Sequence, residues 1–268
     1  MRLMASYRNE SLRIYRRIFC LLTFHISTLI ISPASAQIVP DSTLGNNSSI
    51  VQKRQNTNGN SSSLITGGSR SGSNLLHSFN EFNVGEGQSV FFDNPSAINT
   101  IISRVTGNNT TRILGLLGVR GTARLFLLNS NGIFFGSNAA ISLNNSFLVS
   151  TANRIGFLDD SSLFTRPPLN STEVLSRSRP SRLIFDSRTG PIRVKGLGNN
   201  LSDLAVMPID NPIIFPFGLS VSPDSTIALI GGNVEFDSGV LRSFGGNIEI
   251  GGVRGHADIR LIFLTGSL

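Results

Sequence analysis

Three aspartates are the side chains of this sequence best suited to catalysis, because paired carboxylates can cleave glycosidic bonds by acid–base chemistry. They are Asp186, Asp203 and Asp210, all in the last third of the chain. Such a reaction requires two carboxylates on one face of the protein, within about 10 Å of each other. A polysaccharide-binding or polysaccharide-cleaving β-helix protein is therefore one hypothesis for the function. Whether these carboxylates cluster on one face decides for or against it.

The sequence offers little for metal or cofactor chemistry. His77 and His256 are far apart, and neither stands in a metal-ligand spacing such as His-x-x-x-His. The pair Asp159-Asp160 suggests calcium, but it lacks further acidic residues nearby, so a solvated loop is favoured. Gly-x-Ser-x-Gly does not occur, and Gly245-Gly246 lacks the Lys-Ser/Thr of a phosphate loop. We expect no enzymatic activity, no metal, no cofactor and no small-molecule substrate.

Composition and charge point to an all-β chain without a nucleic-acid partner. Only 15% of the residues are charged, 27 are glycine and none is tryptophan, which favours short strands and tight turns over amphipathic helices. The net charge is +7, but the arginine-rich first 36 residues contribute +4 of it. The remaining +3 is spread out, with no Lys/Arg cluster among aromatic residues, so nucleic-acid binding is not expected.

The first 36 residues have the three parts of a secretory signal peptide: an arginine-rich start, an apolar run and a small-residue end. The apolar run, Ile18–Ile31, is shorter than the roughly 20 residues that span a bilayer as a helix, which disfavours a membrane anchor. Ala34 and Ala36 form the small-x-small pattern that predicts cleavage before Gln37. The only cysteine, Cys20, lies in this segment, so the mature chain has no disulfide.

The central stretch consists of two apolar runs around a turn-forming cluster. Leu125–Leu128 and Ile133–Phe135 flank Asn129-Ser130-Asn131-Gly132. Apolar runs without alternation predict strands that are buried on both sides. Asn-Gly between strands is a strong hairpin signal, but a corner between two successive strands of a coil is equally possible on local grounds.

Apolar runs of about four residues recur along the chain every 8–12 residues, separated by Asn and Gly, which is typical of an all-β protein. Residues 37–73 suggest short edge strands of an N-terminal cap, with a flexible leader as the alternative. Ala97–Val105 has apolar residues at helical spacing and is predicted as a helix. Residues 159–180 interrupt the pattern and suggest a loop excursion. Further strands are predicted at 75–84, 89–92, 182–185, 192–194 and 213–215.

The last third contains an internal repeat. Gly231–Phe236 returns 14 positions later as Gly245–Ile250, each time as turn glycines followed by an alternating strand. One turn and one strand per unit is the signature of a stacked array. Together with the even strand spacing, it favours a coiled β-solenoid over a β-sandwich.

Four segments in order carry a resemblance to a known family. Leu75–Val105, Gly107–Gly136, Phe147–Phe157 and Gly218–Val253 resemble the N-terminal secretion domain of filamentous-haemagglutinin-type exoproteins, in the form common in cyanobacteria. The family's motif Asn-Pro-Asn-Gly-Ile corresponds here to Asn129, Ser130, Asn131, Gly132 and Ile133, with Ser130 in place of the proline. We expect these five residues to be structural, with a special backbone geometry at Asn131 and Gly132, and to support secretion by fixing the fold.

The resemblance implies a right-handed parallel β-helix over residues 37–253, after a signal peptide over 1–36. It also implies two-partner secretion, in which an outer-membrane β-barrel transporter with periplasmic receptor domains recognises this domain. The product would then be secreted or held at the cell surface, where it would lead to adhesion.

Residues 254–268 depart from the family pattern, and we interpret them as a divergent, truncated tail of a longer exoprotein. Within them, Ile259–Leu264 reads as an apolar strand without a polar cap. An uncapped solenoid exposes its interior and unpaired backbone groups, so we expect self-association through that end.

Overall fold

The chain folds into stacked β-strands, seen in a computed structural model that describes residues 37–55, 61–168, 174–196 and 218–262. These residues belong to one unit, Ala36–Leu268. The predicted signal peptide and the predicted strand at 213–215 lie outside the described residues. Within the described residues, no helix has the length and the apolar character needed to cross a membrane.

In chain order, the elements are β1 (Ile38–Pro40), the 3₁₀ turn η1 (Gly45–Asn47), β2 (Ser49–Gln55), β3 (Ser61–Gly67), β4 (Ser69–Ser71), β5 (Asn74–Val84), β6 (Ser89–Asp93), β7 (Thr100–Val105), β8 (Thr111–Ile113), β9 (Leu116–Arg120), β10 (Arg124–Leu128), β11 (Ile133–Phe135), β12 (Ala140–Ser142), β13 (Phe147–Ser150), β14 (Arg154–Phe157), β15 (Ser162–Phe164), β16 (Pro180–Phe185), β17 (Pro191–Lys195), β18 (Leu219–Ser220), β19 (Ile227–Gly231), β20 (Asn233–Asp237), β21 (Leu241–Arg242), β22 (Ile248–Gly252) and β23 (Ala257–Arg260).

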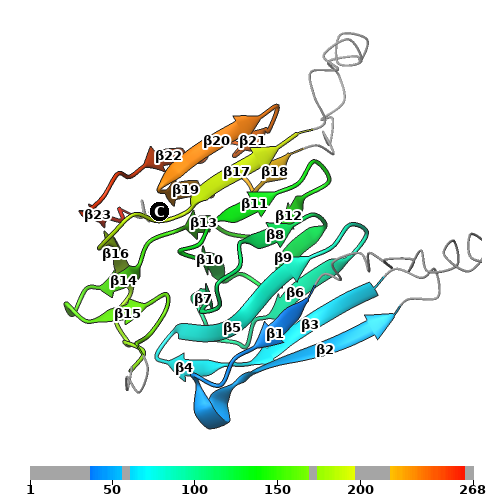
Figure 1. Ribbon diagram of the computed structural model, residues 1–268. Helices are drawn as coiled ribbons and strands as arrows, with labels where there is room; N and C mark the ends of the chain where they lie inside the picture. Colours follow the sequence, from blue (N-terminus) through cyan, green and yellow to red (C-terminus); the bar gives the residue numbers. More distant parts are fainter. Residues whose placement is uncertain (1–36, 56–60, 169–173, 197–217, 263–268) are drawn as a thin grey trace, which may run out of the picture. The chain divides into compact units, whose positions relative to one another are not determined.

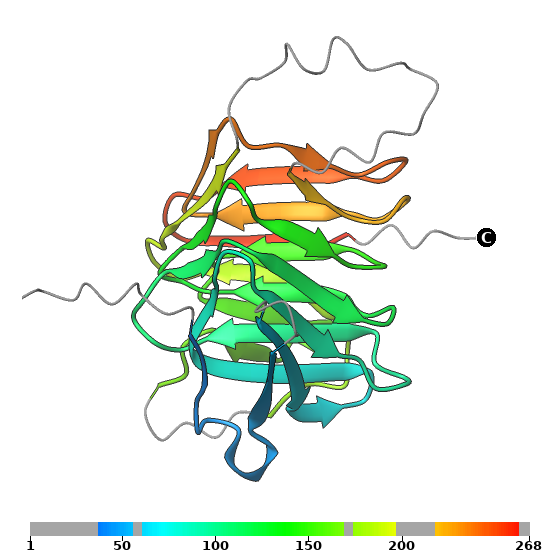
Figure 2. The ribbon, with the colours of Figure 1, turned by 90° about the vertical axis from the view of Figure 1, so that its right-hand side faces the viewer.

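The strands form a parallel β-helix, because the chain visits the same three faces on each turn. The first face is the ladder β5-β7-β10-β13-β19-β22, the second is β3-β6-β9-β12, and the third is β5-β8-β11-β17-β20. Neighbours in each ladder are parallel, and the stacked rungs are visible in Figure 2. The long β5 bends from the first face into the third, pairing with β7 and then with β8. The predicted solenoid class is confirmed.

Where no segment is inserted, one coil takes 21 to 29 residues rather than the 14 of the sequence repeat. Leu125 of β10 lies opposite Ile101 on one side and Phe147 on the other, and Ile227 lies opposite Ile248. The two copies of the 14-residue repeat form β20 and β22, which lie on different faces. The repeat therefore consists of two similar turn-and-strand segments within one coil. The interpretation of the repeat as the stacking unit of the solenoid was wrong.

The first face is buried on both sides, which explains its unbroken apolar runs. Leu125 and Leu127 point into the solenoid core, whereas Phe126 belongs to a second core on the outside of that face. All three side chains are fully buried. Burial of one such side chain stabilises the fold by about 1.5–3 kcal/mol. The two predicted central strands are confirmed as β10 and β11, although Phe134 of β11 is half-buried.

An antiparallel sheet covers the outside of the first face. This inserted sheet has the order β15-β14-β16-β23, and the chain forms most of it between β13 and β17 (Figure 1). Ile155, Leu163 and Leu183 pack from it into the second core. The predicted loop excursion at 159–180 therefore contains the strand β15 and the first residue of β16. The alternation of apolar and polar residues was weak in this segment because β15 has only three residues.

The predicted helix at Ala97–Val105 was wrong. Thr100–Val105 form β7, and all six side chains are buried. Apolar residues at 98, 101, 102 and 105 imitate a helical period, but here they face two different cores. Residues at 100, 101, 102 and 105 are β-branched, which favours a strand.

The N-terminal residues form a cap rather than a flexible leader. β2 and β3 make an antiparallel hairpin at the edge of the second face, and β1 and β4 pair antiparallel with β5. The cap is connected to the inserted sheet by Arg104, which is 1% exposed. Arg104 donates to Ser78 Oγ at 2.9 Å, to Thr43 Oγ1 at 3.1 Å and to the Phe164 carbonyl at 2.8 Å. The carboxylate of Asp41 accepts from the same two hydroxyls.

The described part of the predicted apolar end strand Ile259–Leu264, residues 259–262, is not the last rung of the solenoid. β23 turns back and pairs antiparallel with β16, with Ile259 opposite Leu183. Ile259 and Leu261 pack partly buried against the second core. The last rungs are instead β20 and β22, which end their ladders.

Candidate functional site

Residues Asn129–Ile133 form a corner between two faces of the solenoid. β10 before them belongs to the first face and β11 after them to the third, so the two strands do not pair as a hairpin. The Gly132 amide donates to the Asn129 carbonyl at 3.1 Å and closes a four-residue turn. Gly132 has a φ of +120°, a conformation that favours glycine. The corner alternative is the correct one.

The Asn129 carboxamide is the centre of the corner. This residue is fully buried, and its Nδ2 donates to the Asn109 carbonyl and to Thr111 Oγ1, both at 2.9 Å. Its Oδ1 accepts from the amide and from Nδ2 of Asn131, both at 3.0 Å. Two donors and two acceptors are thus satisfied, and the side chain connects this coil to the preceding one.

Asn131 stabilises the corner through its side chain rather than through an unusual backbone. Its Nδ2 donates to the Gly107 carbonyl at 2.7 Å, and it is absent from the residues with positive φ. Arg166, which follows β15, approaches Asn131 Oδ1 with Nη1 at 3.4 Å. The same guanidinium donates to the Thr106 carbonyl at 3.1 Å and to Asn108 Oδ1. The inserted segment therefore contacts two successive corners, at residues 106–108 and at Asn131, and stabilises both.

Gly190 is a residue of this corner that sequence reasoning missed. Its amide donates to the Ser130 carbonyl at 2.8 Å, and a Cβ there would lie 2.1 Å from the Asn131 carbonyl oxygen. Ser130 is half-buried, and Ile133 is fully buried opposite Ile192. The signal that could have identified Gly190 is its place just before β17, as Gly132 stands before β11.

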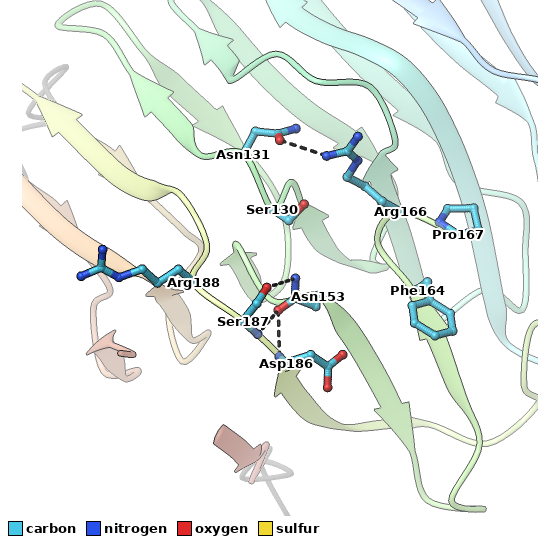
Figure 3. A pocket seen from close by; sticks show the side chains of 9 residues that line it. All are labelled: Ser130, Asn131, Asn153, Phe164, Arg166, Pro167, Asp186, Ser187 and Arg188. Atoms are coloured by element: carbon cyan, nitrogen blue, oxygen red, sulfur yellow. Dashed lines mark hydrogen bonds between the residues drawn. The ribbon is translucent and has the colours of Figure 1, made fainter. Parts of the chain in front are cut away.

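A polar cleft of about 480 Å³ lies beside the corner (Figure 3). Arg154 holds the Asp186 carboxylate with two hydrogen bonds of 2.8 and 2.6 Å. The hydrogen bond from Arg154 keeps the pKa of Asp186 below its usual value. An ionised carboxylate committed to an arginine is a poor general acid. The residues that line the cleft are Ser130, Asn131, Asn153, Phe164, Arg166, Pro167, Asp186, Ser187 and Arg188.

The other side chains considered for chemistry have structural partners. Asp159 accepts from the hydroxyls of Ser161 and Ser176, and these hydrogen bonds lower its pKa to about 2. Asp160 pairs instead with Arg182, so the two neighbouring aspartates do not share a ligand. Within the described ranges, no group of three His, Cys, Asp or Glu residues could hold a metal ion.

His77 is a core residue rather than a ligand. It is fully buried, its Nδ1 lies 3.1 Å from Ser49 Oγ, and its ring packs against Phe92. Burial lowers the pKa of His77 to about 4. Asp203 and Asp210, the other two aspartates of the predicted acidic cluster, lie outside the described residues.

These features define a class: a parallel β-helix with buried asparagine and glycine corners and an antiparallel sheet inserted between two coils. The TPS secretion domain family matches residues 36–264, and the chain belongs to that family. It is thus a two-partner secretion module, and proteins with this domain are secreted through the two-partner system. The predicted boundaries at residues 36 and 253 stay predictions.

Several solved structures match this chain, and one of them is named here. The chain is similar to the solved structure entitled "Crystal structure of filamentous hemagglutinin secretion domain", with 16% sequence identity and a TM-score of 0.39. The similarity covers 80% of this chain and 99% of that chain. No curated protein matched the sequence.

Proposed function

We propose that this chain is exported by a cleaved signal peptide and then recognised by an outer-membrane β-barrel transporter with periplasmic receptor domains. Membership of the TPS secretion domain family over residues 36–264 carries the proposal. The mature chain has no cysteine, so it cannot be trapped by disulfides before it reaches the transporter.

The parallel β-helix suits folding on the far side of a pore. In most of the solenoid a rung pairs with rungs only 21 to 29 residues away, so a coil can fold as soon as it emerges. Before that, the unfolded strands can add to the edge of a receptor sheet through backbone hydrogen bonds. Folding outside would then bias transport outward.

Secretion into the medium tests the proposal. The full chain would be expressed in a Gram-negative host with and without a cognate two-partner transporter. The protein is expected in the medium only with the transporter, and mass spectrometry should find Gln37 at its N-terminus. Equal amounts in the medium without the transporter, or an intact Met1 in a membrane fraction, would contradict the proposal.

Adhesion at the cell surface is the outcome that we propose for the secreted product. The alternative, a polysaccharide-binding or polysaccharide-cleaving protein, requires free carboxylates that cluster. Asp186, the one described member of the predicted acidic group, is instead held by Arg154. Polysaccharide cleavage by the purified protein would reverse this preference.

We also propose that the chain self-associates through the open end of the solenoid. Ile248 and Ile250 of β22 lie in register with the fully buried Ile227 and Leu229, so they point toward the interior. With no described rung beyond them, they are 44% and 53% exposed. Phe236 of β20 is 40% exposed for the same reason. Apolar side chains beside an unpaired strand edge are complementary to the same surface of a second copy.

A further inference from the structure

The inserted sheet carries an unfavourable pairing of charges. Arg182 of β16 and Arg260 of β23 lie directly opposite each other in antiparallel register. Side chains of such a pair stand on the same side of the sheet, about 5 Å apart at Cβ, and like charges there are destabilising. An anion bound over the pair would relieve this repulsion.

The carboxylates nearby neutralise only one of the arginines. Arg182 pairs with Asp160 at 3.1 Å and with Asp258 at 3.3 Å. Arg260 and Arg179 are exposed and make no ion pair with the described residues. Two guanidinium groups are therefore free to bind an anion from solution.

These arginines line a cleft that also has an apolar rim. The cleft has a volume of about 490 Å³. Leu158 is 58% exposed and Ile262 is 76% exposed, so two aliphatic side chains of the cleft are open to solvent. The lining residues are Phe157, Leu158, Asp160, Arg179, Ser181, Arg182, Arg260, Leu261 and Ile262.

We propose that this cleft binds the acidic headgroup of a lipid and so docks the module on a membrane surface. Arg179 and Arg260 would donate hydrogen bonds to the phosphate oxygens, which guanidinium groups bind well. Leu158 and Ile262 would lie among the first methylenes of the acyl chains, since interfacial sites combine basic groups with exposed aliphatic ones. A free phosphate would use only the basic half of this surface.

Vesicle co-sedimentation with the full chain tests the proposal. Vesicles of phosphatidylglycerol and phosphatidylcholine should bind the protein, and vesicles of phosphatidylcholine alone should not. The double variant Arg179→Gln/Arg260→Gln should bind the acidic vesicles roughly 30-fold more weakly, because each basic residue at the surface contributes about fivefold. Leu158→Ser/Ile262→Ser should weaken binding without changing the charge.

The matched control is Lys53→Gln/Arg54→Gln on β2, which removes two positive charges from exposed positions elsewhere. It should change binding less than threefold, and circular dichroism should show the same β-structure for all variants. An equal loss in the control would mean unspecific attraction and would overturn the proposal. Failure of the parent to bind, equal binding to phosphatidylcholine, or equally tight binding of glycerol phosphate would also overturn it.

Discussion

Asn129 and Asn131 stabilise the same corner in different ways. Asn129 is buried and satisfied by four hydrogen bonds, whereas Asn131 reaches back to the Gly107 carbonyl and meets Arg166. Since a buried amide that loses its partners costs about 1–3 kcal/mol, the geometry of Asn129 is tightly specified. The five residues Asn129–Ile133 thus stabilise the fold, and their link to secretion is part of the proposed function.

At Gly132, replacement by valine should destabilise the fold by about 3 kcal/mol. The φ of +120° is strained for a β-branched residue, and its Cβ would lie 2.9 Å from the Pro191 carbonyl oxygen. Gly252→Val is the control, because a Cβ at Gly252 meets no atom within 4 Å. Denaturant unfolding measures both. Equal midpoints for Gly132→Val and the parent would show that the corner does not require glycine.

Ser130 stands where the family motif has proline, and Ser130→Pro should stabilise the protein by about 0.4–1 kcal/mol. Ser130 is the second residue of the turn closed by Asn129 and Gly132, a position that suits proline. Its amide donates no hydrogen bond to the described residues. Asn131→Pro, which removes the 3.0 Å bond from the Asn131 amide, should instead destabilise. Thermal melting compares the two, and a lower melting temperature for Ser130→Pro would contradict the prediction.

His77 should make the stability depend on pH between about 6.5 and 4. Burial lowers its pKa from 6.5 to about 4 in the folded state, so the unfolded chain binds the proton first. Stability is therefore complete above pH 6.5, falls as the pH drops toward 4, and levels off below. The total loss is roughly 3 kcal/mol.

Denaturant unfolding at several pH values between 7.5 and 4.5 measures this effect. His77→Gln should flatten the profile in that window, because the uncharged side chain does not titrate. His256→Gln, at an exposed position, serves as the control and should follow the parent. A parent profile that is flat from pH 7 to 4.5 is the result that would refute the assignment.

At the scale of elements, the cap, the first face and the inserted sheet depend on one another through Arg104. The Asp41 carboxylate next to it is partly buried, which works to raise its pKa. Hydrogen bonds from Thr106, Thr43 and Ser78 outweigh that effect and lower the pKa. A network of this kind joins segments that are far apart in sequence, so it is formed only after all three elements have docked.

Arg104→Met should destabilise the protein by about 3 kcal/mol, because this buried charged group loses its hydrogen bonds to Ser78, Thr43 and the Phe164 carbonyl. It should also speed hydrogen exchange in β15 and in the segment after β1 that contains Thr43, since both lose the same hydrogen-bond donor. Arg112→Met is the control: Arg112 is exposed and lies over the Phe134 ring at 4.7 Å. Exchange that increases at only one of the two segments would mean that Arg104 does not couple them.

At the scale of the whole molecule, the open end should control association. Ile248→Lys/Ile250→Lys places charge on the exposed rung and should give monomers that keep their β-structure. Sedimentation of the parent should show concentration-dependent assembly. Ile262→Lys is the control, because Ile262 follows β23 on the inserted sheet and not on the end of the ladder. A parent that sediments as a monomer at tens of micromolar would contradict the proposal.

The sequence was sufficient for the all-β class, for most strands and for the solenoid. Leu125–Leu128 and Ile133–Phe135 are apolar without alternation, which predicts buried strands, and the structure has a core on each side of the first run. Asn129 and Gly132 marked the turn between them correctly. These features are local, since they depend on side-chain type and on the two-residue period of a strand.

Only the tertiary structure decided between a hairpin and a corner at Asn129–Gly132. Both arrangements use the same Asn-Gly turn. They differ in whether β10 and β11 pair with each other or with strands of neighbouring coils. The same holds for Thr100–Val105, where burial in two cores overrides the helical spacing. Gly190 and Arg166 joined the corner because the inserted sheet returns there, 35 or more residues after the motif. Contacts between segments so far apart depend on how the coils stack, and local sequence does not encode that register.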